Sequence, residues 1–337
     1  MAGEKTEEQG LTTADALLFA AAAGVAVGNL YWTQPLLARI AENFGVQASV
    51  GGHLMTATQV GYALGILLLV PLGDMANRRK LVTTLLALCA VLAVWGGWNV
   101  KTDPPVKNVA VTVPRLPADL DGLKIVQLTD IHVSPLYEKE RFTDLVKKVN
   151  AQNPDFIFIT GDIADGTPQS RRAIMPFLHD LKAKIGVVMI PGNHDYYVDY
   201  TAWRHYYKSI GVPFLENGHV EFRKGDDVIT VVGMTDRSGI QYGYPGPDIE
   251  KATFGADASN ALRIGLIHRP EDAAKWADPR WGLDLLLAGH THGGQIFIMY
   301  PSVWLQNHGY VRGLYHVGNI PFYVSPGIGS WSGTPTR

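Results

Sequence analysis

The sequence contains little cysteine and almost no net charge. A single cysteine, Cys89, among 337 residues excludes a disulfide within the chain. A formal net charge of −2 excludes the strong basic field that nucleic-acid-binding proteins use, so we expect no nucleic-acid partner. Charged residues are also scarce before Lys101, whereas the remainder has an ordinary globular composition. Composition therefore divides the chain into an apolar front part and a globular part.

Three long apolar runs occupy residues 1–100. They are Ala16–Leu37, Leu54–Leu72 and Leu81–Val100. A helix needs roughly 20 apolar residues to cross a bilayer, and each run approaches or exceeds that length. Buried helices of a soluble domain are the alternative, which three consecutive runs of this length disfavour. We therefore expect three transmembrane α-helices, at about 16–37, 54–72 and 81–100.

The loop between the second and third runs contains three cations, Arg78, Arg79 and Lys80. Short loops rich in Lys and Arg stay on the cytoplasmic side of a membrane. This places the chain after the third run on the outer face, although Lys101 and Lys107 favour the opposite orientation.

Two segments of this front part resemble a major facilitator superfamily transporter. Gly28–Pro35 is similar to that family's first helix, and Pro71–Lys80 to its loop between helices two and three. The resemblance covers only residues 14–95, about a quarter of such a fold, and a midplane substrate site needs both repeats. The segment is thus a re-used anchor or the mark of a fused gene, and transport by this chain alone is not expected.

Residues 101–120 form a linker and lead-in, because Pro104 and Pro105 end any helix before the domain at 121–337. In that domain five apolar runs predict buried strands, and each ends in polar residues. The runs are Leu123–Leu128, Phe156–Thr160, Gly186–Ile190, Leu262–Ile267 and Leu283–Ala288. Glu140–Asn150 carries apolar residues at helical spacing between the first two runs. The alternation predicts an α/β fold with its ligands at the carboxyl ends of strands.

The polar clusters after these runs suit divalent metals. Asp130 and His132 alternate, so both side chains point to one face of an extended strand end, and His290 and His292 do the same. Asp162 could bridge two ions with its two oxygens. Carboxylate oxygens and imidazole nitrogens are ligands of Mn, Fe, Zn and Co.

Each residue alone has a simpler interpretation. A lone histidine such as His268 is more often a core or surface residue, and Gly161-Asp162 is a common turn. The ordered set, not any single member, makes the pattern specific. Five further histidines belong to no cluster and are interpreted as structural: His179, His205, His219, His308 and His316.

The ordered blocks resemble the calcineurin-like metallophosphoesterases over residues 120–330. The blocks are Asp130-x-His132, Gly161-Asp162, Gly192-Asn193-His194-Asp195, His268 and Gly289-His290-Thr291-His292. The resemblance implies a four-layer sandwich of two facing mixed β-sheets flanked by helices. The longer last block and the lead-in Pro114–Pro117 look most like bacterial membrane-anchored members, similar to UDP-2,3-diacylglucosamine pyrophosphatase.

This resemblance also implies a role for each residue. One divalent ion would be held by Asp130, His132, Asp162 and His292, and a second by Asp162, Asn193, His268 and His290. His194 matches the family's general acid, and Asp195 would orient its imidazole. A hydroxide bridging the two ions would hydrolyse a phosphodiester or pyrophosphate.

The sequence indicates the substrate and the membrane location less directly than the metal ligands. The aromatic run from Tyr196 to Tyr207 and the apolar stretch Ile296–Leu305 are more typical of packing than of binding. A narrower hypothesis is that they form a rim for a lipid-linked phosphate ester at the bacterial inner membrane, in a multi-pass protein whose catalytic domain faces outward. The alternatives are a piece of a transporter and an inactive metal-binding membrane protein. The glycine-rich segment Ser325–Gly333 resembles the family's penultimate turn, so we expect the final strand to be lacking.

Overall fold

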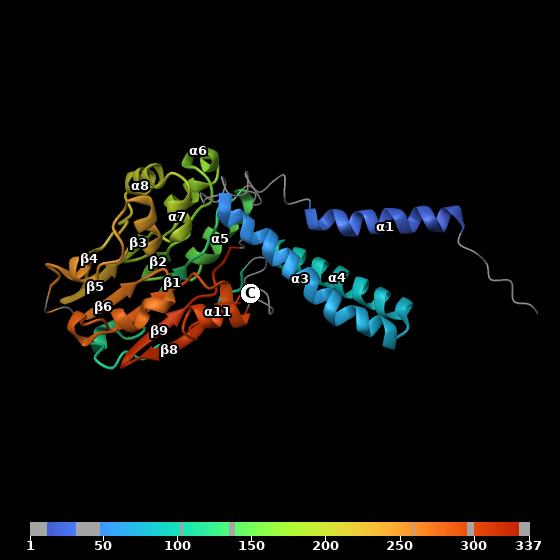
Figure 1. Ribbon diagram of the computed structural model, residues 1–337. Helices are drawn as coiled ribbons and strands as arrows, with labels where there is room; N and C mark the ends of the chain where they lie inside the picture. Colours follow the sequence, from blue (N-terminus) through green and yellow to red (C-terminus); the bar gives the residue numbers. More distant parts are fainter. Residues whose placement is uncertain are drawn as a thin grey trace, which may run out of the picture. The chain divides into compact units, whose positions relative to one another are not determined.

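The computed structural model describes residues 12–31, 48–101, 104–134, 139–257, 259, 261–294 and 300–329. These residues fall into two compact units, residues 1–87 and 88–337. The boundary lies inside the helix Arg78–Lys101 (Figure 1).

The apolar front part is helical. Its helices are α1 (Thr13–Tyr31), α3 (Ala48–Met75) and α4 (Arg78–Lys101), the last of which continues into the second unit. Asn77 Oδ1 accepts a hydrogen bond from Lys80 N at 3.1 Å at the start of α4. Arg78 Nη2 pairs with Asp74 Oδ1 at 2.6 Å, so the cationic loop also ties the two helix ends together.

Three membrane-spanning helices are not supported. Within the residues that the structure describes, two segments are long and apolar enough to cross a membrane, Thr58–Met75 and Arg78–Trp98. The expected first span, 16–37, falls on α1, which has 19 residues and ends at Tyr31, while residues 32–37 lie outside the described part. The transporter-like segment 28–35 also extends beyond the described residues.

The globular unit contains two β-sheets. The first has the order β1-β2-β3, all parallel, with β1 (Ile125–Leu128), β2 (Phe156–Thr160) and β3 (Gly186–Ile190). The second is mixed and has the order β4-β5-β6-β7-β9-β8. Its strands are β4 (Gly218–Lys224), β5 (Asp227–Gly233), β6 (Leu262–Leu266), β7 (Leu285–Ala288), β8 (Gly313–Val317) and β9 (Ile320–Val324).

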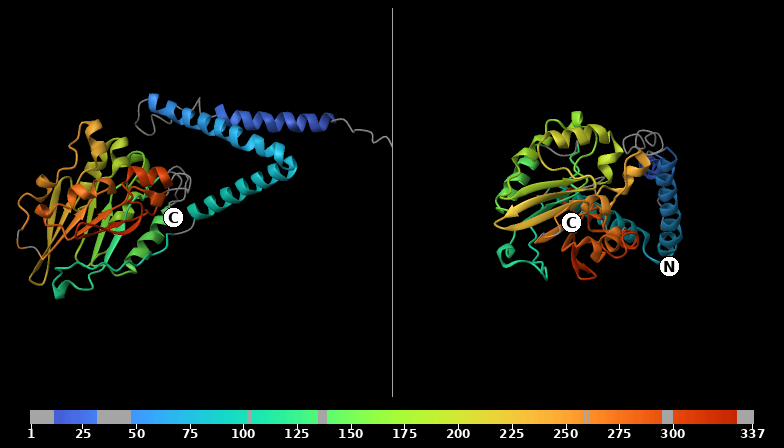
Figure 2. Two further views of the ribbon diagram at one scale, coloured as in Figure 1. Left: turned by 60° about the horizontal axis from the view of Figure 1, so that its bottom comes forward. Right: turned by 90° about the vertical axis from the view of Figure 1, so that its left-hand side faces the viewer.

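Helices cover the outer face of each sheet (Figure 1; Figure 2, right-hand view). On the first sheet lie α5 (Lys139–Asn150), α7 (Asn193–Tyr197) and α8 (Tyr200–Ser209), and the short α6 (Pro168–Arg171) contacts α8. On the second lie α9 (Ile249–Thr253) and α10 (Ala273–Trp276). The short α11 (Tyr300–Gln306) follows the last histidines, and 3₁₀ turns occupy 118–120, 175–180, 237–242, 270–272, 279–281 and 292–294.

Strand β2 shows why its sequence is apolar throughout. Phe156 and Phe158 belong to the core between the two sheets, whereas Ile157 and Ile159 belong to the core beneath the helices. Successive side chains of a strand point to opposite faces, so a strand covered on both faces is apolar at every position. The unit therefore has four layers, helix-sheet-sheet-helix, as the family resemblance implies.

Each predicted strand of this unit is observed, although β1 and β7 begin two residues later than predicted and β6 ends one residue earlier. The predicted runs 156–160 and 186–190 coincide with β2 and β3, and α5 begins one residue before the predicted helix. Its apolar residues Phe142, Leu145, Val146 and Val149 are all buried against the first sheet. After β9 the described chain continues to Gly329, and a missing final strand beyond it stays a prediction.

Candidate metal centre

The parallel strands deliver all the predicted site residues to one edge of the two sheets. The loops after β1, β2, β3, β6 and β7 carry Asp130 to His132, Asp162, Asn193 to Asp195, His268, and His290 to His292 respectively. The carboxyl ends of neighbouring parallel strands meet at one edge, which brings residues 160 positions apart into contact. All nine residues are buried except His290, which is partly exposed.

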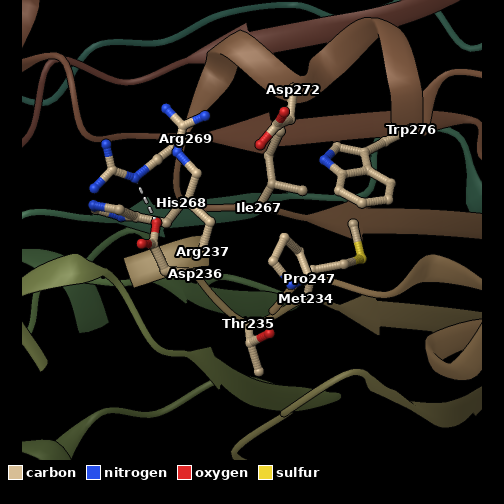
Figure 3. A pocket seen from close by; sticks show the side chains of 10 residues that line it. All are labelled: Met234, Thr235, Asp236, Arg237, Pro247, Ile267, His268, Arg269, Asp272 and Trp276. Carbon is tan, nitrogen blue, oxygen red and sulfur yellow. Dashed lines mark hydrogen bonds and ion pairs between the residues drawn. The ribbon is translucent and has the colours of Figure 1, made fainter. Parts of the chain in front are cut away.

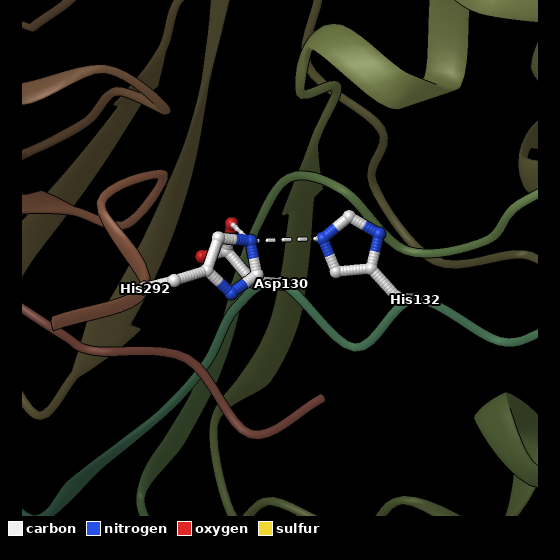
Figure 4. A group of neighbouring side chains, drawn as sticks. All are labelled: Asp130, His132 and His292. Carbon is white, nitrogen blue, oxygen red and sulfur yellow. Dashed lines mark hydrogen bonds and ion pairs between the residues drawn. The ribbon is translucent and has the colours of Figure 1, made fainter. Parts of the chain in front are cut away.

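Asp130, His132 and His292 form one group (Figure 4). His132 Nε2 lies 3.1 Å from His292 Nε2, which lies 3.5 Å from Asp130 Oδ1. Asp130 Oδ2 accepts hydrogen bonds from Thr129 Oγ1 and from the backbone N–H of His290. Its Oδ1 is buried and has no hydrogen-bond partner among the residues that the structure describes. One carboxylate oxygen thus remains available to a ligand between the two imidazoles.

Asp162, His268 and His290 form a second group. His268 Nε2 lies 3.3 Å from Asp162 Oδ2, 3.3 Å from His290 Nδ1 and 3.0 Å from Asn193 Oδ1. These four residues are the ones expected for the second ion. His268 Nδ1 contacts the carbonyl oxygen of Thr160 at 2.8 Å, which fixes the ring and turns Nε2 toward the group.

One oxygen of Asp162 lies between the two groups. Oδ2 is 3.7 Å from His132 Nε2 and 3.3 Å from His268 Nε2. Oδ1 accepts the backbone N–H of His194 at 2.8 Å. The structure therefore differs from the expectation that both oxygens bridge, because Oδ1 is occupied and Oδ2 alone faces both groups.

The backbone is strained at five of these residues. Positive φ angles occur at Asp130 (51°), His132 (47°), Asp162 (52°), His290 (72°) and His292 (48°). A non-glycine residue in this region costs about 1–3 kcal/mol and persists only where the surroundings impose it. Such strain clusters at functional sites, so the five angles mark this edge independently of the side chains.

Adjacent glycines permit the close approach of the loops. A Cβ atom on Gly192 would overlap the Asp162 carboxylate, and one on Gly289 would overlap Thr129 Oγ1. The absence of a side chain at these two positions therefore lets the loops that carry the candidate ligands pack against one another.

The donor set fits divalent ions. Two ligands at about 2.1 Å from an ion and at a tetrahedral angle lie about 3.4 Å apart, and the separations within each group are 3.0–3.5 Å. The buried, unpaired Asp130 Oδ1 and the mixture of carboxylate, imidazole and amide donors suit the same borderline metals.

The structure corrects the role predicted for Asp195. Its Oδ2 accepts backbone N–H groups of Gly192 at 2.7 Å and Asp162 at 3.1 Å, and its Oδ1 accepts the Tyr207 hydroxyl at 3.0 Å. Burial, with the Asp162 charge next, raises the pKa of Asp195 to about 7. Asp195 therefore holds the loops together and does not orient His194.

Asp165 contacts the His194 imidazole instead. Its Oδ1 lies 2.8 Å from His194 Nδ1 and 3.3 Å from His132 Nδ1. Sequence reasoning missed this residue, although it follows Asp162 by three positions in Gly161-Asp162-Ile163-Ala164-Asp165. The available signal was a second aspartate three residues after Asp162. The loop after β2 that carries it meets the turn after β3 that carries His194.

The aromatic run after the site packs into the core. Tyr196, Tyr200, Trp203 and Tyr207 are buried against the first sheet, so packing is the correct interpretation for them. Tyr197 is partly exposed and accepts a hydrogen bond from Asn193 Nδ2 at 2.9 Å. In the other apolar stretch, Trp304 and Leu305 of α11 are exposed, while residues 296–299 lie outside the described part.

The carboxylates change the proton affinity of the histidines. Burial, the largest single influence, lowers the pKa of His132. The nearby carboxylates, Asp165 first and then Asp162 and Asp130, together outweigh it and raise that pKa to about 9. Burial is likewise outweighed at His268, where Asp162 is the main cause of a pKa of about 10. Despite burial, these histidines hold the pKa of Asp162 well below its usual range. Protons therefore occupy His132 and His268 at neutral pH when no ion is bound.

Metal affinity is consequently expected to decrease as the pH is lowered. Ligand histidines must be neutral, so binding at pH 7 displaces a proton from His132 and from His268, whose pKa values are about 9 and about 10. Below those values each displaced proton costs about tenfold in affinity per pH unit, and the competition disappears above them. Calorimetric Mn²⁺ titration of metal-free protein from pH 6 to 8, in buffers of different ionisation enthalpy, measures both effects. Affinity independent of pH would contradict this assignment.

Comparison with known proteins agrees with the fold and identifies the family. The family model for calcineurin-like phosphoesterases matches residues 123–294, which include every predicted site residue. The chain belongs to the calcineurin-like phosphoesterase family. The two candidate metal-ligand groups lie within the region that matches this family.

The relatives are themselves described only in general terms. A zebrafish (Danio rerio) "transmembrane protein with metallophosphoesterase domain" is 36% identical over 75% of this chain and 59% of its own length. An uncharacterised metallophosphoesterase, YkuE, of Bacillus subtilis is 34% identical over 64% of this chain and 74% of its own. A solved Thermus thermophilus sulfate thiohydrolase, SoxB, shares 17% identity over 56% of this chain and 37% of its own, with a TM-score of 0.40. The matched region spans about three fifths of the first two curated relatives, at 59% and 62% of their lengths.

Proposed function

We propose that this protein is a membrane-anchored phosphoesterase that uses two divalent ions to hydrolyse phosphodiester or pyrophosphate bonds. The observation that carries the proposal is the position of Asp162 Oδ2, which lies 3.7 Å from His132 Nε2 and 3.3 Å from His268 Nε2. A carboxylate oxygen between two histidine groups is the arrangement that two neighbouring ions require. The backbone N–H of His194, the proposed proton donor, binds the other oxygen of the same carboxylate.

Each ion would have its own ligands and share Asp162. The first would be held by Asp130, His132, Asp162 and His292, and the second by Asp162, Asn193, His268 and His290. When bound, the pair would supply an activated water and neutralise the charge on phosphoryl oxygens. The metals could be Mn, Fe, Zn or Co, which accept this donor set.

His194 would donate a proton to the leaving oxygen. Asp165 Oδ1 lies within hydrogen-bond distance of His194 Nδ1, and a carboxylate accepts, so Nδ1 carries a hydrogen. The other ring nitrogen, Nε2, is then the one that delivers a proton to substrate. The same Asp165 oxygen contacts His132 Nδ1, which leaves His132 Nε2 as the nitrogen for an ion.

The membrane anchor rests on the two candidate spans. Side chains of Thr58–Met75 and Arg78–Trp98 pack into no core, and large apolar residues such as Leu67 and Val94 are exposed there. Exposed apolar helices of this length are stable in a bilayer. A relative is named as a transmembrane protein, which supports the same placement. The outward orientation and the bacterial inner membrane stay predictions, as does the transporter alternative.

Hydrolysis by the full chain tests the proposal. The chain, extracted from alkali-washed membranes in detergent and loaded with Mn²⁺, is expected to hydrolyse a chromogenic phosphodiester or a pyrophosphate. Activity should disappear with chelator and in His290→Ala, whose Nδ1 faces the second group. Release of the chain by the alkaline wash would contradict anchoring. Folded, metal-loaded protein inactive on monoesters, diesters and pyrophosphates would contradict the enzymatic proposal.

A lipid-linked substrate is the narrower form of this proposal. It is supported by α11, which follows His292 and exposes Tyr300, Trp304 and Leu305 to the extent of 41%, 48% and 68%. Aromatic and aliphatic side chains of this kind favour the boundary between water and lipid. In lipid vesicles an acylated substrate should be hydrolysed faster than its deacylated form, and equal rates would contradict the idea.

A further inference from the structure

Arg269 lies directly after His268 and reaches the second histidine group. Its Nε donates to Asp236 Oδ2 at 2.8 Å and its Nη2 donates to Ser238 Oγ at 3.0 Å. Its Nη1 lies 3.0 Å from His290 Nε2. Figure 3 draws this wall of the site, with a dashed line from Arg269 to Asp236. The guanidinium is therefore fixed on one side and turned toward the candidate centre on the other.

The guanidinium of Arg269 is hydrogen-bonded to a carboxylate through only one of its three nitrogens. Asp236 is buried and binds Nε alone, while Nη1 and Nη2 contact neutral partners. Glu271 Oε1 is 3.9 Å from Nη1, beyond hydrogen-bond distance, and it is paired with Arg237. The Arg269 side chain is 17% exposed. Exchange of a neutral partner for an anion at Nη1 would thus add a charged hydrogen bond, which is stronger than a neutral one.

Loading of the second ion would break the contact with His290. His290 Nδ1 faces the group, at 3.3 Å from His268 Nε2. An imidazole that gives Nδ1 to an ion carries its hydrogen on Nε2. The Nε2–H of His290 and the Nη1–H of Arg269 would then be two donors only 3.0 Å apart, with no acceptor between them. An anionic oxygen beside these two groups would accept from both.

We propose that Arg269 binds a non-bridging phosphoryl oxygen of the substrate through Nη1, while Asp236 and Ser238 hold the guanidinium in position. This assignment rests on the proposed phosphoesterase function and adds a substrate-binding residue to it. The ligand class is a phosphate oxyanion, which accepts a charge-assisted hydrogen bond from Nη1.

Inorganic phosphate is the probe for this site. The full chain in detergent, loaded with Mn²⁺, is compared with Arg269→Gln and Arg269→Lys by calorimetric phosphate binding, metal analysis and steady-state kinetics. Arg269→Gln should keep the wild-type metal content, bind phosphate about tenfold or more weakly and raise KM in parallel, with a smaller change in kcat. Arg269→Lys should retain part of the affinity because it keeps the charge but not the contacts with both Asp236 and Ser238 that hold Nη1 in position. The matched control is Arg280→Gln, which removes an exposed arginine paired with Asp278 and should change none of these values.

A double variant separates binding from folding. Arg269→Gln alone leaves the buried Asp236 without its partner, so Asp236→Asn with Arg269→Gln removes both charges together. The double variant should show the same weakening of phosphate binding. Phosphate affinity equal to wild type in the folded variants, or loss of metal from Arg269→Gln, would overturn the assignment while leaving wild-type hydrolysis intact. Metal-loaded wild type that neither hydrolyses esters nor binds phosphate would instead overturn the proposed function and this assignment with it.

Discussion

Asp162→Asn is expected to lose bound metal and to lower the hydrolysis rate by more than about 100-fold, since even residues that only support a metal ligand cost about 10–100-fold when changed. The reason is the position of Oδ2 between His132 Nε2 and His268 Nε2. Asparagine has nearly the same shape but is neutral and replaces one oxygen by an amide nitrogen. Elemental analysis and initial rates on the same purified full-length preparation measure both effects.

A matched control separates this effect from a general loss of charge. Asp278→Asn changes the same residue type at a partly exposed position where the carboxylate pairs with Arg280. It should leave metal content and rate at the wild-type level. Full metal occupancy in Asp162→Asn would show that this carboxylate does not bridge the two groups.

His194→Ala is expected to slow hydrolysis in proportion to how poor the leaving group is. General acid catalysis contributes about 10²–10⁴-fold, and an oxygen that leaves readily without a proton gains little of it. The variant should therefore lose about that factor on an alkyl ester and far less on a nitrophenyl ester. Metal content should stay unchanged, because the side chain of His194 is not among the proposed ligands.

Kinetics on a series of esters distinguishes this role from a structural one. His205→Ala is the control, since His205 is exposed on α8 and should give wild-type rates throughout the series. A loss in His194→Ala that is the same for good and poor leaving groups would show that this residue positions substrate or structure and does not supply a proton.

The sequence predicted β2 and β3, which are buried on both faces, but it missed β5, which is also buried apart from its first residue. β2 and β3 have apolar runs bounded by polar residues, because helices cover one face and the second sheet covers the other. β4 was not predicted, since its residues Gly218–Lys224 are half exposed and mix polar with apolar side chains. Edge strands of this kind resemble loops in composition, and their pairing depends on a partner that local sequence does not specify.

The clustering of the predicted ligand residues follows from strand order. Each follows a recognisable strand, and the ends of parallel strands share an edge. The partner of His194 was not predictable by adjacency in the chain. Asp195 lies in the first turn of α7 and its carboxylate turns back to the Gly192 N–H, a common use of an acidic residue there. Asp165 arrives from the loop after β2, a contact set by the tertiary fold.

The number of membrane helices was predicted less well than the site. Apolar length alone suggested three spans, whereas the described helices include two that are long and apolar enough. The hypothesis of a transporter-like front end depends on the same segment and stays a prediction. By contrast, five positive φ angles at predicted ligands could not be inferred from sequence, and they support the same site independently.

A metal titration of the full chain tests the central claim most directly. Metal-free protein is titrated with Mn²⁺ while bound metal and phosphoesterase rate are followed together. Two groups sharing Asp162 predict that the rate reaches its plateau at about two equivalents of ion per chain, as a two-metal site requires. A plateau at one equivalent, or full activity without added metal, would contradict the dinuclear centre.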